Sequence, residues 1–224
     1  MATIVQPLGA QAAPLGVPSA QAIASRTDLT KAVAGYMNRT DLDPAMDSFI
    51  VIAEGRIALD LRTWQMVKPA TLTQSEGEEW IAVPADWLDW DGLWIDGDRL
   101  DYASPDTWQN LVNTQRTAGQ YSMLGGYLLV ADMLPTGAPD IVVKASYYAR
   151  IPALNDTDPA PWLLTQYPQV YLYAALVSAC EYVKDDARAQ GWAAQYQAMV
   201  STLNSISRKA LVSGSTLRLA GPRR

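Results

Sequence analysis

The residues best suited to chemistry are a run of aspartates set among tryptophans near the middle of the chain. Closely spaced carboxylates with a glycine are typical of calcium-binding loops. If Gly92 is the glycine of such a loop, the first ligand position falls on Trp87, which has no oxygen for calcium, and the last falls on Asp98. The calcium pattern therefore fails, and aspartates at turns of a β-rich segment account for the run. These carboxylates are Asp86, Asp89, Asp91, Asp96 and Asp98.

The same segment could also handle a sugar. Two carboxylates on either side of a glycosidic bond can cleave it, and tryptophan rings can stack on sugar rings. Large aromatic residues at strand spacing are also typical of protein cores and interfaces. A carbohydrate-binding or carbohydrate-cleaving tail module therefore stays open as an alternative function. Its tryptophans would be Trp80, Trp87, Trp90 and Trp94.

Other familiar chemistries are missing from the sequence. The chain has no histidine, which excludes histidine-based triads, histidine zinc sites and imidazole acid–base catalysis. Gly125-Gly126 is not followed by the lysine of a phosphate-binding loop. The single cysteine, Cys180, cannot form a disulfide within the chain and stands among Ala and Val as a small buried hydrophobe would. We expect no enzymatic activity, no catalytic residues, no cofactor and no metal.

Composition narrows the class of partner. Hydrophobic residues make up 49% of 224 residues, which is enough for a sizeable core. The net charge of -6 argues against a protein that binds nucleic acid by neutralising phosphates. No apolar run reaches the roughly 18 residues of a membrane span, and prolines interrupt the N-terminal segment where a secretory signal would need an apolar core. We expect a protein made in the cytosol that has no membrane partner.

The sequence patterns predict an α+β fold, mainly an α-helical bundle with a small antiparallel β-domain inserted. Residues 26–66 and 150–209 carry helical periodicity and form the helical core. Residues 67–149 have short strand-like runs separated by turn residues, typical of a small sandwich or barrel. Residues 1–25 lack apolar periodicity and are interpreted as a flexible N-terminal arm. Residues 210–224 form a basic C-terminal tail.

Two hairpin signals lie inside the β-domain. Asp96-Gly97 and Gly125-Gly126 are both dipeptides that favour the tight turn between antiparallel strands. Ile141–Tyr148 supplies a last strand before the chain returns to helices.

The helix after Pro168 is apolar on almost every side from Tyr171 to Cys180. Such a helix must be covered all round, and another subunit could supply part of that cover. The next helix is capped near Asp185 and Asp186, and its apolar residues recur at spacings of three and four. The candidate core residues of these helices and the N-terminal ones are Phe49, Ile50, Ile57, Trp162, Leu176, Trp192, Tyr196, Met199 and Leu203.

The order of short motifs resembles one known family. The head–tail adaptor proteins of tailed bacteriophages are similar to this chain from about Leu29 to Asn204. The motifs that carry the resemblance are Asp41-Leu42, Phe49-Ile50, Ala53-Glu54, Leu61-Arg62, Pro84–Leu88, Tyr147–Leu154, Pro161–Leu164, Tyr167-Pro168, Tyr171–Leu176 and Asp185–Arg188. The longer N-terminal arm and the Trp-Asp run from Trp87 to Trp94 depart from the family pattern.

The resemblance implies a structural virion protein at the head–tail junction, assembled in the host cytoplasm. Such adaptors form a ring, commonly of twelve copies, on the distal face of the portal. They present a platform for tail or nozzle proteins, and packaged DNA passes through their channel without specific binding. A different tail-completion connector is a further alternative, which only the identity of the partner would separate.

A ring requires two different complementary faces on each subunit, so surplus apolar surface should lie on separate elements. The apolar helix and the Trp-rich segment are the candidates, and the basic tail could dock on an acidic partner or remain solvated. The acidic segment from Glu76 to Asp101 could line the DNA channel or form a solvated face. The candidate interface residues are Tyr171, Ala175, Tyr182, Trp87, Trp90, Trp94, Arg218, Arg223 and Arg224.

Overall fold

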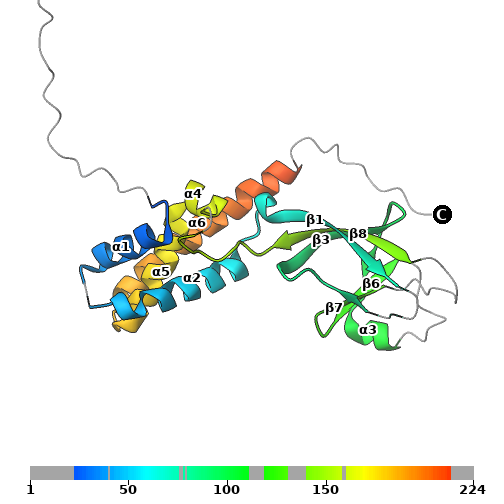
Figure 1. Ribbon diagram of the computed structural model, residues 1–224, viewed down its shortest axis with the longest axis horizontal. Coiled ribbons are helices and arrows are strands. Elements are labelled where there is room, and N and C mark those ends of the chain that lie inside the picture. Colours follow the sequence, from blue (N-terminus) through cyan, green and yellow to red (C-terminus); the bar gives the residue numbers. More distant parts are fainter. Residues whose placement is uncertain are drawn as a thin grey trace, which may run out of the picture.

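The fold is α+β, with a bundle of helices at one end and two small β-sheets at the other (Figure 1). The structure is a computed structural model. It describes residues 23–39, 41–75, 78, 80–110, 119–130, 140–157 and 160–212. Most of the expected N-terminal arm, and the C-terminal tail beyond residue 212, lie outside the described residues.

The first two helices come from the N-terminal part of the chain. Helix α1 (Arg26–Met37) begins after Ser25, whose Oγ accepts a hydrogen bond from the N–H of Asp28 at 3.1 Å. Such a bond satisfies one of the backbone donors left free at a helix start. Helix α2 (Met46–Asp60) follows a short 3-10 helix, η1 (Asp43–Ala45), which has proline in its first turn.

Three further helices follow the β-strands. Helix α4 (Trp162–Gln166) leads into α5 (Pro168–Tyr182), and a tight turn then connects α5 to the long α6 (Asp186–Val212). The carboxylate of Asp185 accepts a hydrogen bond from the N–H of Arg188 at 3.2 Å and caps α6. Helix α5 is the central element, because α1, α2, α4 and α6 all pack against it.

The position of α5 corrects one expectation. Tyr171 and Ala175 are 1% and 0% exposed, so neither can contact a neighbouring subunit. The apolar helix is indeed covered on all sides, but the cover comes from helices of the same chain. Part of this cover comes from α1 and α2, which are far from α5 in sequence, so the local pattern around α5 could not show it.

The remaining core candidates fall into two groups. Phe49, Ile50, Ile57, Leu176, Tyr196 and Leu203 are buried in the cluster around α5. Trp162, Trp192 and Met199 are half-buried at the rim of the same cluster. Trp192 stacks on Tyr173, with 5.6 Å between ring centroids, and meets Tyr36 edge-on at the same distance.

The first sheet contains the two longest strands. β8 (Ile141–Ala149) lies between β1 (Val67–Gln74) and β3 (Trp87–Ile95), antiparallel to both. The short β4 (Asp98–Arg99) pairs with the end of β3 through a turn in which Asp96 and Gly97 have φ angles of 52° and 94°. Positive φ at both turn positions is typical of the expected hairpin turn.

The second sheet has the strand order β2-β7-β6-β5. Its hairpin joins β6 to β7 through Gly125 and Gly126, whose φ angles are 59° and 85°. Both sheets contribute buried side chains to one small core, so they form a sandwich. The strands are β2 (Ile81–Ala82), β5 (Asp101–Tyr102), β6 (Gln120–Leu124) and β7 (Tyr127–Val130), and the core residues are Ile81, Leu93, Leu100, Leu128, Val130, Val143 and Ala145.

One pair of strands departs from the antiparallel pattern that we expect from the sequence. β5 and β6 are parallel. Parallel neighbours need a crossover connection, and the chain between these strands contains α3 (Pro105–Asn110). The connection between β5 and β6 is therefore a crossover through α3 and not a hairpin turn.

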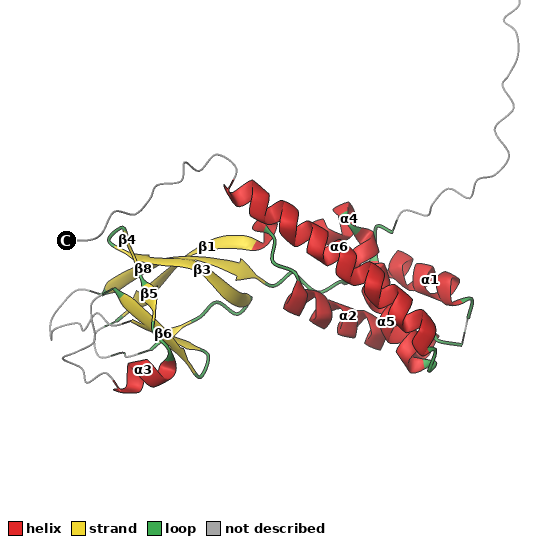
Figure 2. Ribbon diagram, turned by 180° about the vertical axis from the view of Figure 1, so that it is seen from behind, coloured by secondary structure: helices red, strands yellow, loops and turns green. Residues whose placement is uncertain are grey.

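The two regions meet at a short 3-10 helix, η2 (Trp64–Met66), which leads from α2 into β1 (Figure 2). Asn204 of α6 accepts a hydrogen bond from the N–H of Arg62 and donates one to the carbonyl of Asp60, both at 2.9 Å. The hydroxyl of Ser207 accepts the N–H of Trp64 at 2.7 Å. Helix α6 therefore anchors the start of the β-region.

Candidate assembly interfaces

Two tryptophans of β3, Trp87 and Trp90, pack on aromatic rings of their own chain. Trp87 and Trp90 have ring centroids 5.5 Å apart, and Trp90 meets Tyr147 of β8 edge-on at 6.0 Å. Residues three apart in a regular strand point to opposite faces. The register of β3 against β8 shifts between Trp87 and Asp89 and again between Trp90 and Gly92, which is how the two rings come together.

Trp94 makes a different contact. Its ring lies over Gly92, where a Cβ atom would stand 2.3 Å from the nearest ring carbon. Only glycine leaves room for the ring in this position. Trp87, Trp90 and Trp94 are thus half-buried by contacts within their own chain, and their role toward a partner stays a prediction.

The aspartates of the same segment also have partners. One oxygen of Asp86 accepts a hydrogen bond from Lys68 at 2.7 Å, and the other accepts the hydroxyl of Tyr147 at 2.9 Å. The Lys68 bond lowers the pKa of Asp86. Asp91 accepts the hydroxyl of Ser146 at 3.0 Å. Among the described residues, no three carboxylate or thiol side chains come together as a possible metal site.

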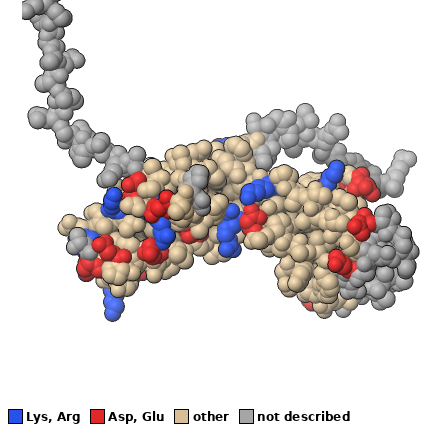
Figure 3. Space-filling view, in the orientation of Figure 1, with Lys and Arg blue, Asp and Glu red and all other residues tan. Residues whose placement is uncertain are grey.

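Charge is distributed unevenly between the two regions. Figure 3 shows lysine and arginine mainly over the helices and the junction, while the β-region carries mostly aspartate on the visible face. The carboxylates of Asp89, Asp96, Asp98 and Asp101 belong to exposed residues. They make the β-region an acidic surface.

Other aromatic side chains of the β-region are more exposed than the three tryptophans. Trp80 and Tyr127 are 47% and 49% exposed and have ring centroids 6.2 Å apart. Tyr102 is 59% exposed and contacts Tyr121. Sequence patterns gave these tyrosines no special weight, because alternation along such short strands does not show which face is covered.

In the bundle, Tyr182 at the end of α5 is 63% exposed and touches Phe49 of α2. Of the three bundle residues expected at an interface, it is the one with free surface. Arg218, Arg223 and Arg224 lie outside the described residues.

Helix α2 exposes aliphatic side chains that the sequence patterns did not single out. Val51, Ile52 and Leu59 are 61%, 50% and 79% exposed and point away from the core. The available signal was the presence of these large apolar residues off the core-facing stripe of Phe49, Ile50 and Ile57. In a helix with a single buried stripe, the opposite side is usually polar.

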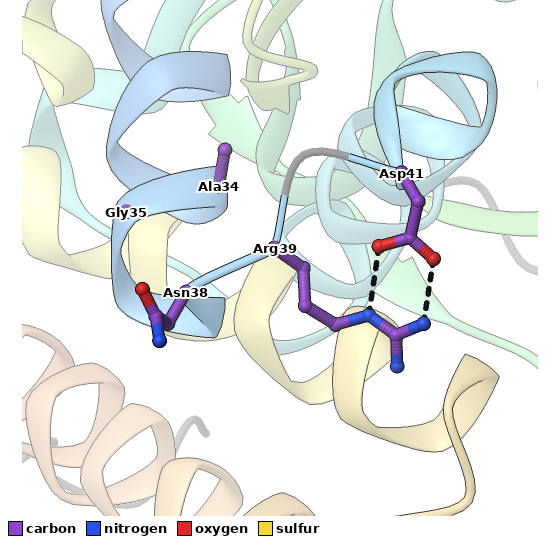
Figure 4. Close-up of a pocket in the computed structure, with 5 residues that line it drawn as sticks. All are labelled: Ala34, Gly35, Asn38, Arg39 and Asp41. Carbon is purple, nitrogen blue, oxygen red and sulfur yellow. Dashed lines mark hydrogen bonds and ion pairs between the residues drawn. The ribbon is translucent and has the colours of Figure 1, made fainter.

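The bundle also has a shallow depression at the end of α1 (Figure 4). Arg39 donates two hydrogen bonds to the carboxylate of Asp41, at 2.8 and 2.6 Å, at its edge. The bond from Arg39 lowers the pKa of Asp41, so the carboxylate stays ionised and already paired. The depression has a volume of about 460 Å³ and is lined by Ala34, Gly35, Asn38, Arg39 and Asp41.

Glu54 and Cys180 have raised pKa values because each is packed within the bundle. Burial raises the pKa of Glu54, whose carboxylate accepts the N–H of Leu154 and holds the returning chain on α2. Burial also raises the pKa of Cys180, which is fully buried next to the sulfur of Met37. A buried neutral thiol is unreactive.

No helix in the described part of the chain has the length and apolar character needed to cross a bilayer.

Comparison with known proteins identifies the family. No curated protein matches the chain. The model of the family described as SU10 adaptor protein matches residues 24–219, which include both the bundle and the β-region. The match covers the segments in which the short adaptor-like motifs lie, and it extends beyond them at both ends. The chain therefore belongs to the SU10 adaptor protein family, a family of phage adaptor proteins.

Proposed function

We propose that this protein forms the adaptor ring that connects the portal of a phage head to the tail and continues the DNA channel. The observation that carries the proposal is the family match over residues 24–219, which includes both the helical bundle and the inserted strands. Twelve copies is the number that the resemblance to head–tail adaptors implies.

The division of the molecule supports separate roles for its two ends. The bundle has a large apolar core and an exposed aliphatic face on α2, as a subunit that associates with its neighbours requires. The β-region presents exposed aromatic residues, among them Trp80, Tyr102 and Tyr127, which favour protein interfaces. We assign the bundle to contacts around the ring and the β-region to tail or nozzle proteins.

The acidic β-region is compatible with DNA that passes without being held. Binding to DNA phosphates needs positive charge, and the exposed carboxylates of Asp89, Asp96 and Asp98 would repel them. In this proposal, packaged DNA slides through the ring without specific contacts. The virion is then the site of action, and assembly takes place in the host cytoplasm.

The test is reconstitution with the portal protein of the same phage. The purified chain is mixed with portal rings, separated by size and imaged by negative-stain electron microscopy. We expect an added ring of density on one face of the portal, with a mass that gives the copy number. A portal that stays bare under all conditions contradicts the proposal. Binding to tail proteins without portal binding would support a tail-completion connector instead.

A further inference from the structure

The outward side of α2 is an uncharged, protruding face. Leu59, Val51 and Ile52 are all at least half exposed, and Ser48 and Gly55 are exposed between them. The charged residues of α2 lie to either side of this face. We call Ser48, Val51, Ile52, Gly55 and Leu59 the aliphatic strip. An exposed apolar patch of this kind on a soluble protein marks an interaction site.

The outward side of α6 carries small side chains where α2 carries large protruding ones. Along about five turns it exposes small uncharged side chains at spacings of three and four. Helices with small residues on one face can be approached closely by large side chains of another helix, because large and small side chains then interdigitate. We call this set the small-residue face, and its members are Ala187, Gly191, Ala194, Ala198, Ser201 and Ser205.

The two faces lie on two different helices, both of which pack on α5. Helices α2 and α6 run in the same direction, because both begin near the Tyr182 end of α5 and both reach η2. A closed ring requires two different patches on each subunit that complement each other. These two faces meet that requirement.

The hydrogen bonds of Asn204 set the relative height of the two helices. Asn204 binds the backbone of both Asp60 and Arg62, so it lies level with the end of α2. Both helices rise by about 1.5 Å per residue. Counting back equally along both helices places Gly55, in the middle of the aliphatic strip, level with Ala198. In a ring whose axis runs parallel to α2 and α6, rotation from one copy to the next does not change height along the axis. Faces at the same height therefore meet.

The charges beside the two faces are complementary. Helix α2 carries Asp47 and Asp60 against Arg56, apart from Glu54, which is bound to Leu154, whereas α6 carries Arg188, Arg208 and Lys209 against Asp186. The side chain of Asp47 is 83% exposed, although it pairs with Arg26. By the same counting, Asp47 is level with the first turn or two of α6, where Arg188 is exposed and already donates to the carbonyl of Tyr36 at 2.9 Å. Opposite charges at the rim favour one docking register over others.

We propose that the aliphatic strip of α2 docks on the small-residue face of α6 in a neighbouring copy of this chain. This inference rests on the proposed function, since it names the contact by which the adaptor ring closes. Leu59, Ile52 and Val51 fit between the small side chains of α6, and the acidic end of α2 at Asp60 lies toward the basic last turns of α6 at Arg208 and Lys209.

The experiment is disulfide cross-linking of the full chain on portal rings. Gly55→Cys is suitable because a Cβ there meets no atom within 4 Å, and Ala198→Cys replaces another exposed small residue. The native Cys180 is fully buried and stays in place. When the Gly55→Cys and Ala198→Cys chains are mixed in equal amounts and oxidised, we expect a covalent dimer that contains one chain of each kind.

A matched control uses Ala187→Cys, which lies on the same face of α6 but about 16 Å from the level of Gly55. Mixed with Gly55→Cys, it should give at least about tenfold less dimer. Equal cross-linking of the two pairs, or none by Ala198→Cys in rings that form normally, overturns the proposed contact and leaves the adaptor ring standing. If no ring forms on the portal even with the unmodified chain, the proposed function and this inference fail together.

A second variant tests the same contact without cross-linking. Ala198→Arg places a large charge against the aliphatic strip, and ring formation should fall by at least about tenfold, because a charge buried without a partner is costly. Since Ala198 is exposed in the single chain, its melting temperature should remain that of the parent. Normal rings from this variant would overturn the proposal.

Discussion

The bundle and the β-region place their apolar surface differently. The bundle buries α5 completely inside its own chain and leaves its surplus on the outside of α2. The β-region has a much smaller core, around Leu93 and Leu128, and exposes the aromatic side chains of Trp80, Tyr102 and Tyr127. The most apolar element of a chain therefore need not be the one that contacts a partner. An element with more apolar surface than its own fold can cover is the better candidate.

The largest expected effect separates the buried from the exposed apolar residues of the bundle. Leu176→Ala in α5 should lower the free energy of unfolding by about 2–5 kcal/mol, because it opens a cavity at a fully buried site. Leu59→Ala removes the same atoms from a side chain that is 79% exposed, and its effect on the single chain should stay within about 0.5 kcal/mol. Urea unfolding followed by circular dichroism measures both. Similar losses from the two variants would contradict the distinction.

The β-region should be most sensitive at Gly92. Gly92→Ala forces the ring of Trp94 to move and should cost about 1–3 kcal/mol. In the double variant with Trp94→Ala, the added methyl group meets no ring, so the cost of Gly92→Ala should largely disappear. Thermal unfolding of the four chains of this cycle gives the coupling. Independent, additive effects would show that the ring does not rest on Gly92.

The junction between the two regions should have an intermediate cost. Asn204→Ala removes both hydrogen bonds to the end of α2 and should lower stability by about 1–2 kcal/mol. Asn204→Asp keeps the acceptor for Arg62 but sets a carboxylate oxygen against the carbonyl of Asp60, so it should not restore the loss. Limited proteolysis after Arg62 or Lys68 would show whether the β-region loosens first. Stability unchanged by Asn204→Ala would mean that the two regions are joined mainly by other contacts.

The smallest effect concerns charge in the β-region. The hydrogen bond from Lys68 lowers the pKa of Asp86 below its ordinary value of 3.8, so the folded state favours the carboxylate. Its stabilisation is present above that ordinary value and is lost as the pH falls through the lower pKa of the folded state. Parent and Asp86→Asn should therefore differ by less than about 1 kcal/mol at pH 7, and the difference should shrink below about pH 4.

Urea titrations of both chains between pH 7 and pH 3 test this dependence. Lys68→Met serves as the control, because removing the partner should abolish the same pH-dependent difference. A gap between parent and Asp86→Asn that is constant over the whole range would contradict the assignment of the pKa shift to this ion pair.

Much of the architecture was predictable from local chemistry. Hydrophobic residues at spacings of three and four placed α2 and α6, because such residues can be buried together only on a helix. Asp96-Gly97 and Gly125-Gly126 marked both hairpins, since few other residues tolerate positive φ angles. The α+β class followed from the order of these elements, whereas the adaptor family was named from the resemblance of short motifs; the structure and the family match bear the two out.

The candidate interface was predictable only in part, because exposure depends on what folds over each side chain. The composition of Tyr171–Cys180 showed that α5 needs cover, and tertiary packing decided that its own chain supplies it. The contact between Trp87 and Trp90 depends on register shifts against β8, a strand about 60 residues away in sequence. The parallel pairing of β5 and β6 likewise depends on where the chain returns after α3.

Residue types and short spacings were enough to indicate most helices and strands, to exclude histidine chemistry and to show which family the chain resembles. These properties depend on residue types and on spacings of a few positions. Only the tertiary structure decided that α5 is enclosed and that Val51, Ile52 and Leu59 remain outside. Burial is a property of long-range packing, and no local pattern records which side of an apolar helix the rest of the chain will cover.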